Sequence, residues 1–378
     1  MVSLRETGID PHCWYGVARS TELGDRPLPV ELWGRAIVIY RQKDGAIAAM
    51  DDCCPHRFVK LSDGVVVDGA IECPYHGWQF NGDGGYKTIP YLGPNQRLPN
   101  CRIPTYPVQE QDGFIWLYPV ANADPATLPP PMPIPEWDHL NYIASVATVD
   151  CPGHFSFLIE NLMDMYHGHL HDDYQAWANP RLENLVTEGG NVTAEYAAES
   201  YYRIDKIWSV IQLFMPSTRK LHPEPLHVSY RYPHWHSTLG KEFVIYCLFC
   251  PVGPQRTKAY LIHFTSLQAF WRLHKLPVPF RRWVKNRLFN AAKGMLEGLV
   301  RQDVRAIAQE QQAYLDNPSR RGPEYNPALS AVQRLIRERA ASASMDAKSA
   351  GERGIAEKSI TSTAVAQEIV MEQQMDMQ

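Results

Sequence analysis

The chain has 378 residues, of which 45% are hydrophobic and 21% charged, so it is long enough for more than one hydrophobic core and we expect two domains. Its 37 Lys and Arg against 41 Asp and Glu give a formal net charge of −4, which argues against a nucleic-acid-binding protein. The chain starts without an apolar signal region, and its longest apolar run, Phe243 to Val252, is too short to span a bilayer. We therefore expect a cytoplasmic protein whose eight cysteines serve metal or redox chemistry rather than disulfides.

Short apolar or alternating runs between Trp33 and Tyr86, separated by turns rich in Asp and Gly, predict a small antiparallel β domain. The proline-rich segment from Ala123 to Trp137 cannot continue a helix or a central strand, and we place the domain boundary there. The N-terminal region would then cover residues 1–135, with the β domain at about 33–120, and a second domain would cover residues 136–330.

The second domain begins with an apolar helical segment, Phe155 to His171, and ends with a long helical pattern from Phe280 to Leu315. Between them lie four strand candidates, at residues 191–204, 226–232, 242–252 and 257–267. A helix, a meander and a long helix predict an α+β fold. We expect residues 331–378 to form a flexible tail, because from about Glu338 onward the chain lacks aromatic residues and is rich in Ala, Ser, Glu and Met.

Two turn segments of the N-terminal domain each carry one cysteine and one histidine, Cys54 with His56 and Cys73 with His76. Two thiolates and two imidazoles suit either a tetrahedral zinc ion or a [2Fe–2S] cluster with Cys on one iron and His on the other. Zinc fingers usually pair Cys with Cys and His with His, whereas both segments here are mixed. The mixed pattern, followed by Gly77-Trp78, resembles the Rieske cluster signature.

A second group of polar residues lies in the apolar segment at the start of the second domain. If that segment is one continuous helix, Asn161, Asp164, His167 and His171 fall within about a 120° arc of one face. Uncompensated burial would cost ~2–7 kcal/mol per group, and a metal ion would remove that cost. A zinc protease is excluded because Gly168 stands where H-E-x-x-H requires Glu, so we favour Fe(II) held by two His and one carboxylate.

Together these motifs resemble the single-subunit oxygenase component of Rieske non-haem iron (ring-hydroxylating) oxygenases, of the kind of vanillate O-demethylase-like monooxygenases, over residues ~10 to 330. The resemblance implies an N-terminal Rieske domain and a C-terminal helix-grip catalytic domain. The N-x-x-D-x-x-H pattern of the family is met by Asn161, Asp164 and His167, which implies catalytic roles for Asp164 and Asn161. The late helix that carries the third iron ligand in the family is similar to QDVRAIAQEQQ, which offers Asp303.

The spacing of the histidines departs from the family pattern. Members usually leave four residues between the two histidine ligands, whereas three separate His167 from His171. A continuing helix would keep His171 beside His167, and we prefer it. If the helix breaks after Gly168, His169 or Asp172 becomes an alternative ligand.

The resemblance also implies partners. Electrons would come from NAD(P)H through a separate reductase, with or without a ferredoxin. In a homotrimer, Asp164 would bridge His76 of the partner subunit to His167. The products would arise by O₂-dependent hydroxylation or oxidative demethylation of a small apolar or aromatic substrate. The alternative is a Rieske electron-transfer or ligand-binding protein without oxygenase chemistry.

One basic and aromatic segment, Phe280 to Phe289, could dock an acidic ferredoxin or lie on a membrane surface. We favour an ordinary amphipathic surface helix.

Overall fold

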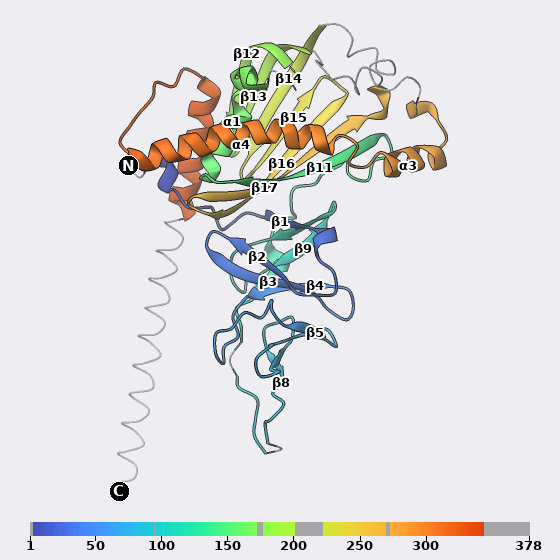
Figure 1. Ribbon diagram of the computed structural model, residues 1–378, viewed down its shortest axis with the longest axis vertical. Coiled ribbons are helices and arrows are strands. Elements are labelled where there is room, and N and C mark those ends of the chain that lie inside the picture. The colour runs from blue at the N-terminus through green and yellow to red at the C-terminus, as the bar shows by residue number, and fades with distance from the viewer. Residues whose placement is uncertain are drawn as a thin grey trace.

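The computed structural model describes residues 3–93, 95–100, 102–171, 177–200, 222–269 and 273–343, which form a smaller N-terminal part and a larger C-terminal part (Figure 1). The N-terminal part consists of small β-sheets, and the C-terminal part has one large antiparallel sheet with helices on one face. This arrangement confirms the predicted α+β fold, with an N-terminal β domain and a C-terminal sheet that carries a long helix.

Three antiparallel sheets build the N-terminal part, and tight turns join their strands. The Asp68-Gly69 turn needs glycine, because Gly69 has a φ of +76° and a Cβ there would lie 2.6 Å from the backbone nitrogen of Lys43. The first sheet has the order β1 (Tyr15–Arg19), β10 (Phe114–Leu117), β9 (Val108–Gln111); the second β2 (Leu28–Leu32), β3 (Arg35–Arg41), β4 (Ile47–Asp51); the third β5 (Val65–Val67), β6 (Ala70–Glu72), β7 (Gln79–Phe80), β8 (Tyr86–Thr88). The short 3₁₀ helices η2 (Ser20–Glu22) and η3 (Pro125–Thr127) follow in this part of the chain, whereas η1 (Leu4–Glu6) packs on the C-terminal part, where Leu4 belongs to the main core.

The C-terminal part is built on a seven-stranded antiparallel sheet. All four predicted strand segments lie in it, although residues 201–204 of the first are outside the described residues. In sheet order the strands are β11 (Tyr142–Cys151), β17 (Arg256–Ser266), β16 (Phe243–Gly253), β15 (His234–Leu239), β14 (His222–Arg231), β13 (Asn191–Ser200) and β12 (Trp177–Glu188). The edge strands β11 and β12 and the inner strand β15 were not among the predicted segments.

Helices cover one face of this sheet, and the largest hydrophobic core lies between the helices and the sheet (Figure 1). Side chains such as Ile159 of α1 (Phe155–Met163) and Ile307 of α4 (Lys293–Asp316) meet buried residues of the central strands there. The short helices η6 (Leu267–Ala269), η7 (Leu273–Lys275) and α3 (Val278–Arg287) follow the last strand. Among the described residues, no helix has both the length and the apolar character needed to cross a membrane.

The prediction of one helix from Phe155 to His171 is wrong. The helix α1 ends at Met163, Asp164 has extended backbone angles (φ −92°, ψ 92°), and the 3₁₀ helix η4 (Met165–His171) follows. The Asp164 carboxylate accepts a hydrogen bond from the backbone nitrogen of Tyr166 at 3.1 Å. Such a local bond offers the backbone an alternative to the helical ladder, so the helix stops there.

The long helical pattern from Phe280 to Leu315 also divides, into α3 and α4. Asn290 lies between them with a φ of 64°, a conformation that Asn tolerates better than most residues. Its backbone nitrogen donates to the carbonyl of Ala144 at 2.9 Å, and its side-chain oxygen accepts from the backbone nitrogen of Val146 at 2.8 Å. These bonds attach the turn to the edge strand β11, which a pattern of apolar residues does not reveal.

The predicted tail at residues 331–378 starts too early. Residues 327–343 form a further helix, in which Val332, Leu335 and Ile336 are buried against the main core. Asn326 precedes this helix, and its side-chain oxygen accepts a hydrogen bond from the backbone nitrogen of Ala328 at 3.0 Å, as an N-cap residue does. The predicted tail residues from 344 onward lie outside the described residues.

The two parts of the molecule pack directly on each other through β1 and β16. Gly16 of β1 leaves room for this contact, because a Cβ there would lie 3.1 Å from the side chain of Leu248. The backbone nitrogens of Trp33 and Gly34 donate to the carbonyls of Pro251 and Val252, each at 2.7 Å.

Candidate functional site

The two segments with mixed Cys and His form loops with the same backbone hydrogen bonds. In each loop the cysteine nitrogen donates to the carbonyl five residues later, Val59 or Trp78, at 2.8 Å. The cysteine carbonyl accepts from the nitrogen four residues later, that of Phe58 at 2.8 Å or Gly77 at 3.1 Å. Both of these donor residues have positive φ, 61° and 68°. The two loops therefore present equivalent turns, one after β4 and one after β6.

The side chains of these loops fit a cluster of two irons and two sulfides. Cys54 and Cys73 are buried free thiols, and burial raises the pKa of Cys54 to about 11, with Cys73 beside it adding to the effect. The rings of His56 and His76 are 4.5 Å apart, and His56 stacks on Trp78 at 4.4 Å. The Nδ1 atom of His56 is buried and has no hydrogen-bond partner among the described residues. Binding of a metal cluster would use the two buried thiols as ligands and would give the unsatisfied imidazole nitrogen a partner.

A second set of candidate ligands meets between η4 and α4. One ligand atom from each of His167, His171 and Asp303 lies within 4.8 Å of the others. The Asp303 Oδ1 atom is 3.6 Å from Nε2 of His167 and 3.2 Å from Nε2 of His171. His169 is exposed, and Asp172 lies outside the described residues. Although the helix breaks, the structure brings His171 rather than His169 beside His167.

Hydrogen bonds orient both imidazoles. The Nδ1 atom of His167 bonds the backbone carbonyl of Asp164, and Nδ1 of His171 lies 3.0 Å from the side-chain oxygen of Gln302. With Nδ1 donating in each ring, Nε2 keeps its lone pair for a metal. Nε2 of His171 is buried and lacks a hydrogen bond of acceptable geometry within the described chain.

The Asp303 carboxylate interacts with both histidines and with the amide of Asn161. Burial lowers the pKa of His167, whereas for His171 the Asp303 carboxylate outweighs burial and raises the pKa. Asn161 donates to Asp303 Oδ1 at 3.3 Å, and its own side-chain oxygen is buried without a partner among the described residues. Two imidazoles and a carboxylate that face one point form the donor set of non-haem Fe(II) sites with open positions.

Sequence reasoning missed three residues of this site. Gln302 directly precedes the predicted ligand Asp303 in the sequence, and this adjacency could have marked it as part of the site. The Trp177 ring lies 5.6 Å from that of His167 and 6.0 Å from that of His171, and its indole nitrogen donates to the carbonyl of Met165 at 2.8 Å. Asn326 donates to the Asp164 carboxylate at 3.0 Å. Nothing local in the sequence marks Trp177 or Asn326.

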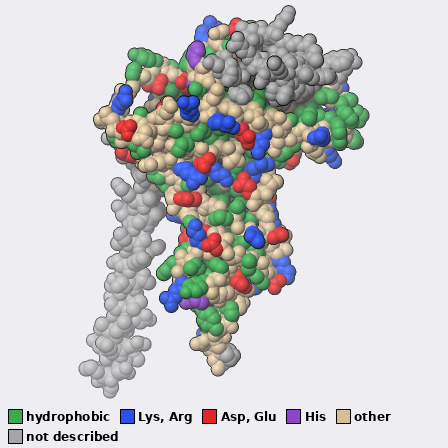
Figure 2. Space-filling model, viewed as in Figure 1, with side chains coloured by type: hydrophobic (Ala, Val, Ile, Leu, Met, Phe, Trp, Pro, Cys, Tyr) green, Lys and Arg blue, Asp and Glu red, His purple; other side chains and the backbone are tan. Residues whose placement is uncertain are grey.

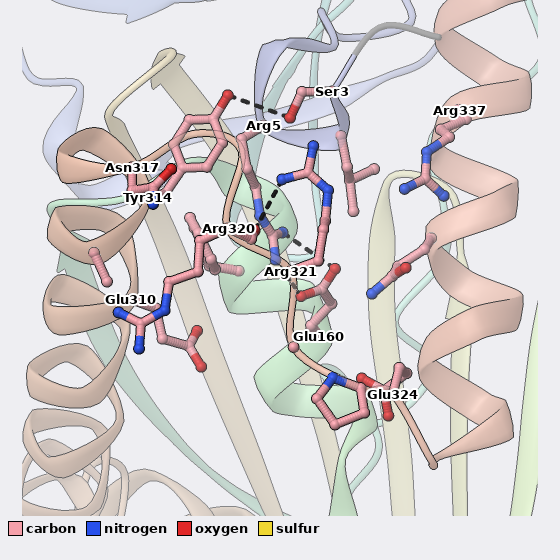
Figure 3. A pocket seen from close by; sticks show the side chains of 16 residues that line it. Ser3, Arg5, Glu160, Glu310, Tyr314, Asn317, Arg320, Arg321, Glu324 and Arg337 are labelled. Carbon is pink, nitrogen blue, oxygen red and sulfur yellow. Dashed lines mark hydrogen bonds and ion pairs between the residues drawn. The ribbon is translucent and has the colours of Figure 1, made fainter.

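A cavity of about 800 Å³ lies beside α1 but is a different place (Figure 3). It is lined by the start of the chain, the C-terminal half of α4 and the segment that follows it, and none of the three candidate iron ligands contributes to it. In its wall Arg5 makes hydrogen bonds of 3.1 and 2.6 Å to the two oxygens of Glu160 and stacks on Phe157. This buried ion pair fixes α1 to the N-terminus, and the cavity is separate from the candidate iron site.

Comparisons with known proteins agree with the two sites. Residues 13–107 match the family model of the Rieske [2Fe-2S] domain. The chain is 31% identical over 349 residues to the 4beta-methylsterol monooxygenase of Methylococcus capsulatus, covering 89% of this chain and 90% of that protein. It is 37% identical over 185 residues to the oxygenase component of dicamba O-demethylase from Stenotrophomonas maltophilia, covering 47% and 52%. The crystal structure of dicamba monooxygenase bound to dicamba has the same fold, with a TM-score of 0.68, 22% identity and coverage of 90% and 99%.

The chain belongs to the Rieske non-haem iron oxygenases, as the long match to the methylsterol monooxygenase shows. It is an oxidoreductase that uses a Rieske [2Fe–2S] cluster and a mononuclear iron, and the oxygenase prediction is favoured over a carrier without oxygenase chemistry. Relatives named as oxygenase components imply a separate reductase or ferredoxin and a small-molecule substrate.

Proposed function

We propose that Cys54, His56, Cys73 and His76 hold the Rieske cluster and that His167, His171 and Asp303 hold the mononuclear iron. The observation that carries this proposal is the convergence of the last three residues, with both Nδ1 atoms bonded to protein oxygens and both Nε2 atoms beside the Asp303 carboxylate. When bound, the cluster supplies single electrons and the ferrous ion activates dioxygen.

The protein's own residues position and connect these groups. Gln302 and the Asp164 carbonyl fix the imidazole rings, and Asn161 orients Asp303 by its hydrogen bond. Trp177 lies edge-on to both rings and forms part of their surroundings. The loops that would hold the cluster lie at the end of the N-terminal part that is far from α1 and α4 (Figure 1). A homotrimer would overcome this separation, with Asp164 between His167 and His76 of the partner subunit.

We propose that the reaction is the oxidation of a methyl group on an apolar ring compound, with one oxygen atom coming from O₂. Two relatives support this reaction class, because their names describe a methylsterol monooxygenase and an O-demethylase. NAD(P)H would supply the electrons through the separate reductase. The cytoplasmic location stays a prediction.

Aerobic turnover with ¹⁸O₂ and an NAD(P)H-fed reductase tests the proposal. The panel contains methylated sterols and aryl methyl ethers, each beside its analogue without the methyl group. We expect labelled alcohol from the sterols or formaldehyde from the ethers, and no product from the analogues. Protein that contains both iron centres but consumes no O₂ with any panel member would favour the electron carrier instead.

A further inference from the structure

The helix α3 turns its aromatic side chains away from the protein. Val284 is its buried residue, packed near Ile143 and Leu267, whereas Phe280 is 46% exposed and Trp283 59% exposed. The rings of Phe280 and Trp283 lie 5.4 Å apart. The helix packs on the protein through Val284, as an amphipathic surface helix does, but its two aromatic side chains lie outside that contact.

Two cations occupy the inner side of α3 instead. Arg281 donates to the side-chain oxygen of Asn141 at 2.6 Å, and Lys285 donates to the carbonyls of Trp137 and His139. These bonds fix the rotation of the helix about its axis. The outward position of Phe280 and Trp283 therefore follows from specific contacts on the opposite side.

The sequence around these aromatics is rich in cations. From residue 267 to residue 296 the sequence contains no Asp or Glu, although the whole chain has a net charge of −4. The same stretch contains seven Lys and Arg residues, at positions 272, 275, 281, 282, 285, 287 and 293. Arg282 and Arg287 are exposed, and within the described part of the chain neither has an ion-pair partner.

We call this surface the basic aromatic patch, made of Val278, Phe280, Trp283 and Phe289 with Lys275, Arg282 and Arg287. Each of its four apolar side chains is at least 37% exposed. Figure 2 shows hydrophobic side chains gathered at the end of the C-terminal part where α3 lies, with Lys and Arg beside them. Trp and Phe favour the interface of a bilayer, and neighbouring cations attract anionic lipids. We propose that the basic aromatic patch docks the protein reversibly on an anionic phospholipid surface.

Two other occupants fit the patch less well. An electron donor must approach the cluster, but α3 lies at the edge of the large sheet, away from the loops near β5 and β8 (Figure 1). A second copy of this chain that met the patch with its own patch, as in a two-fold dimer, would place two basic surfaces against each other, which is unfavourable. Docking requires neither iron centre, so its test is independent of the proposed function.

Co-sedimentation of the full-length protein with vesicles tests the proposal. We expect binding to vesicles of phosphatidylcholine mixed with phosphatidylglycerol, weaker binding to phosphatidylcholine alone, and release by high salt. Phe280→Ser combined with Trp283→Ser should lower the partition coefficient at least about tenfold, since it removes the two most exposed aromatics of the patch.

The matched control is Leu315→Ser combined with Tyr325→Ser, because Leu315 and Tyr325 are also exposed, at 43% and 87%, but lie elsewhere on the surface. This control should bind as the wild type does, and the melting temperatures of both double variants should stay near that of the wild type. Wild-type protein that does not sediment with anionic vesicles would overturn the proposal. So would a Phe280/Trp283 variant that binds normally, or one whose only change is in oligomeric state or in electron uptake from the reductase.

Discussion

Asn326 joins the last helix to Asp164, and its replacement tests both connections. The side chain is buried, its oxygen caps the helix at Ala328, and its nitrogen donates to Asp164 Oδ1. Tyr166 donates to the same oxygen. These bonds fix the carboxylate and leave Oδ2 for His76 of the partner subunit in the proposed electron path.

Two substitutions at Asn326 separate the roles. Asn326→Ala removes the cap, worth about 1 kcal/mol, and a hydrogen bond to a carboxylate, worth roughly 1.5–3 kcal/mol. We expect the free energy of unfolding to fall by about 2.5–4 kcal/mol. Asn326→Ser keeps a capping hydroxyl but is too short to reach Asp164, so its loss should be about 1 kcal/mol smaller. Urea denaturation monitored by circular dichroism measures both values.

The serine variant also tests the electron path. It should retain both iron centres, yet the reduced cluster should reoxidise about 10–100-fold more slowly in a stopped-flow experiment with substrate and O₂, as loss of an outer hydrogen bond at a metal site commonly does. A wild-type rate of reoxidation in Asn326→Ser would refute the role of this hydrogen bond. Equal stability of the alanine variant and the wild type would refute the energetic reasoning.

Four further variants test the site and its support. His171→Ala should lose the mononuclear iron while His169→Ala keeps it by metal analysis, and the opposite result would reverse the assignment of the ligand. Arg5→Met should lower the free energy of unfolding by about 3–5 kcal/mol at neutral pH, because Glu160 is left buried without its partner. Burial already raises the pKa of Glu160, so its protonation at mildly acidic pH should reduce this loss of stability. Denaturation curves that show the same loss at neutral and at mildly acidic pH would contradict the argument. Burial lowers the pKa of His263 to about 4. Between pH ~6.5 and ~4 the histidine is therefore protonated in the unfolded state but neutral in the folded state, so the free energy of unfolding falls by about 3 kcal/mol as the pH drops through this range. His263→Phe should lessen this pH dependence, and an unchanged pH profile would count against it.

The cluster loops could be predicted from sequence because their chemistry is local. Cys54 and His56, like Cys73 and His76, are separated by one or two residues within single turns, so their spacing limits the metal they suit. The iron site is not local, because Asp303 is distant in sequence from His167 and His171. Its assignment from sequence depended on family resemblance, and the structure supplies the geometry that the resemblance lacked.

The failures of the sequence analysis have two different causes, one local and one tertiary. Apolar periodicity continues through Asp164, but a side-chain bond to Tyr166 ends the helix there. The sequence favours an ordinary amphipathic surface helix for α3, but its aromatics Phe280 and Trp283 are exposed, while Lys285 bonds the carbonyls of Trp137 and His139. Local hydrogen bonding therefore overrides the apolar pattern at Asp164. At α3, contacts between segments far apart in the chain override it.

The central claim is that one chain carries two different iron centres, and the content of iron and acid-labile sulfide per chain tests it most directly. Fully loaded wild-type protein should contain the two irons and two sulfides of a [2Fe–2S] cluster plus one further iron. Asp303→Ala should lose only that further iron and keep the visible spectrum of the cluster. Wild-type protein with no iron beyond that of the cluster, zinc in place of both centres, or unchanged iron in Asp303→Ala would contradict the account.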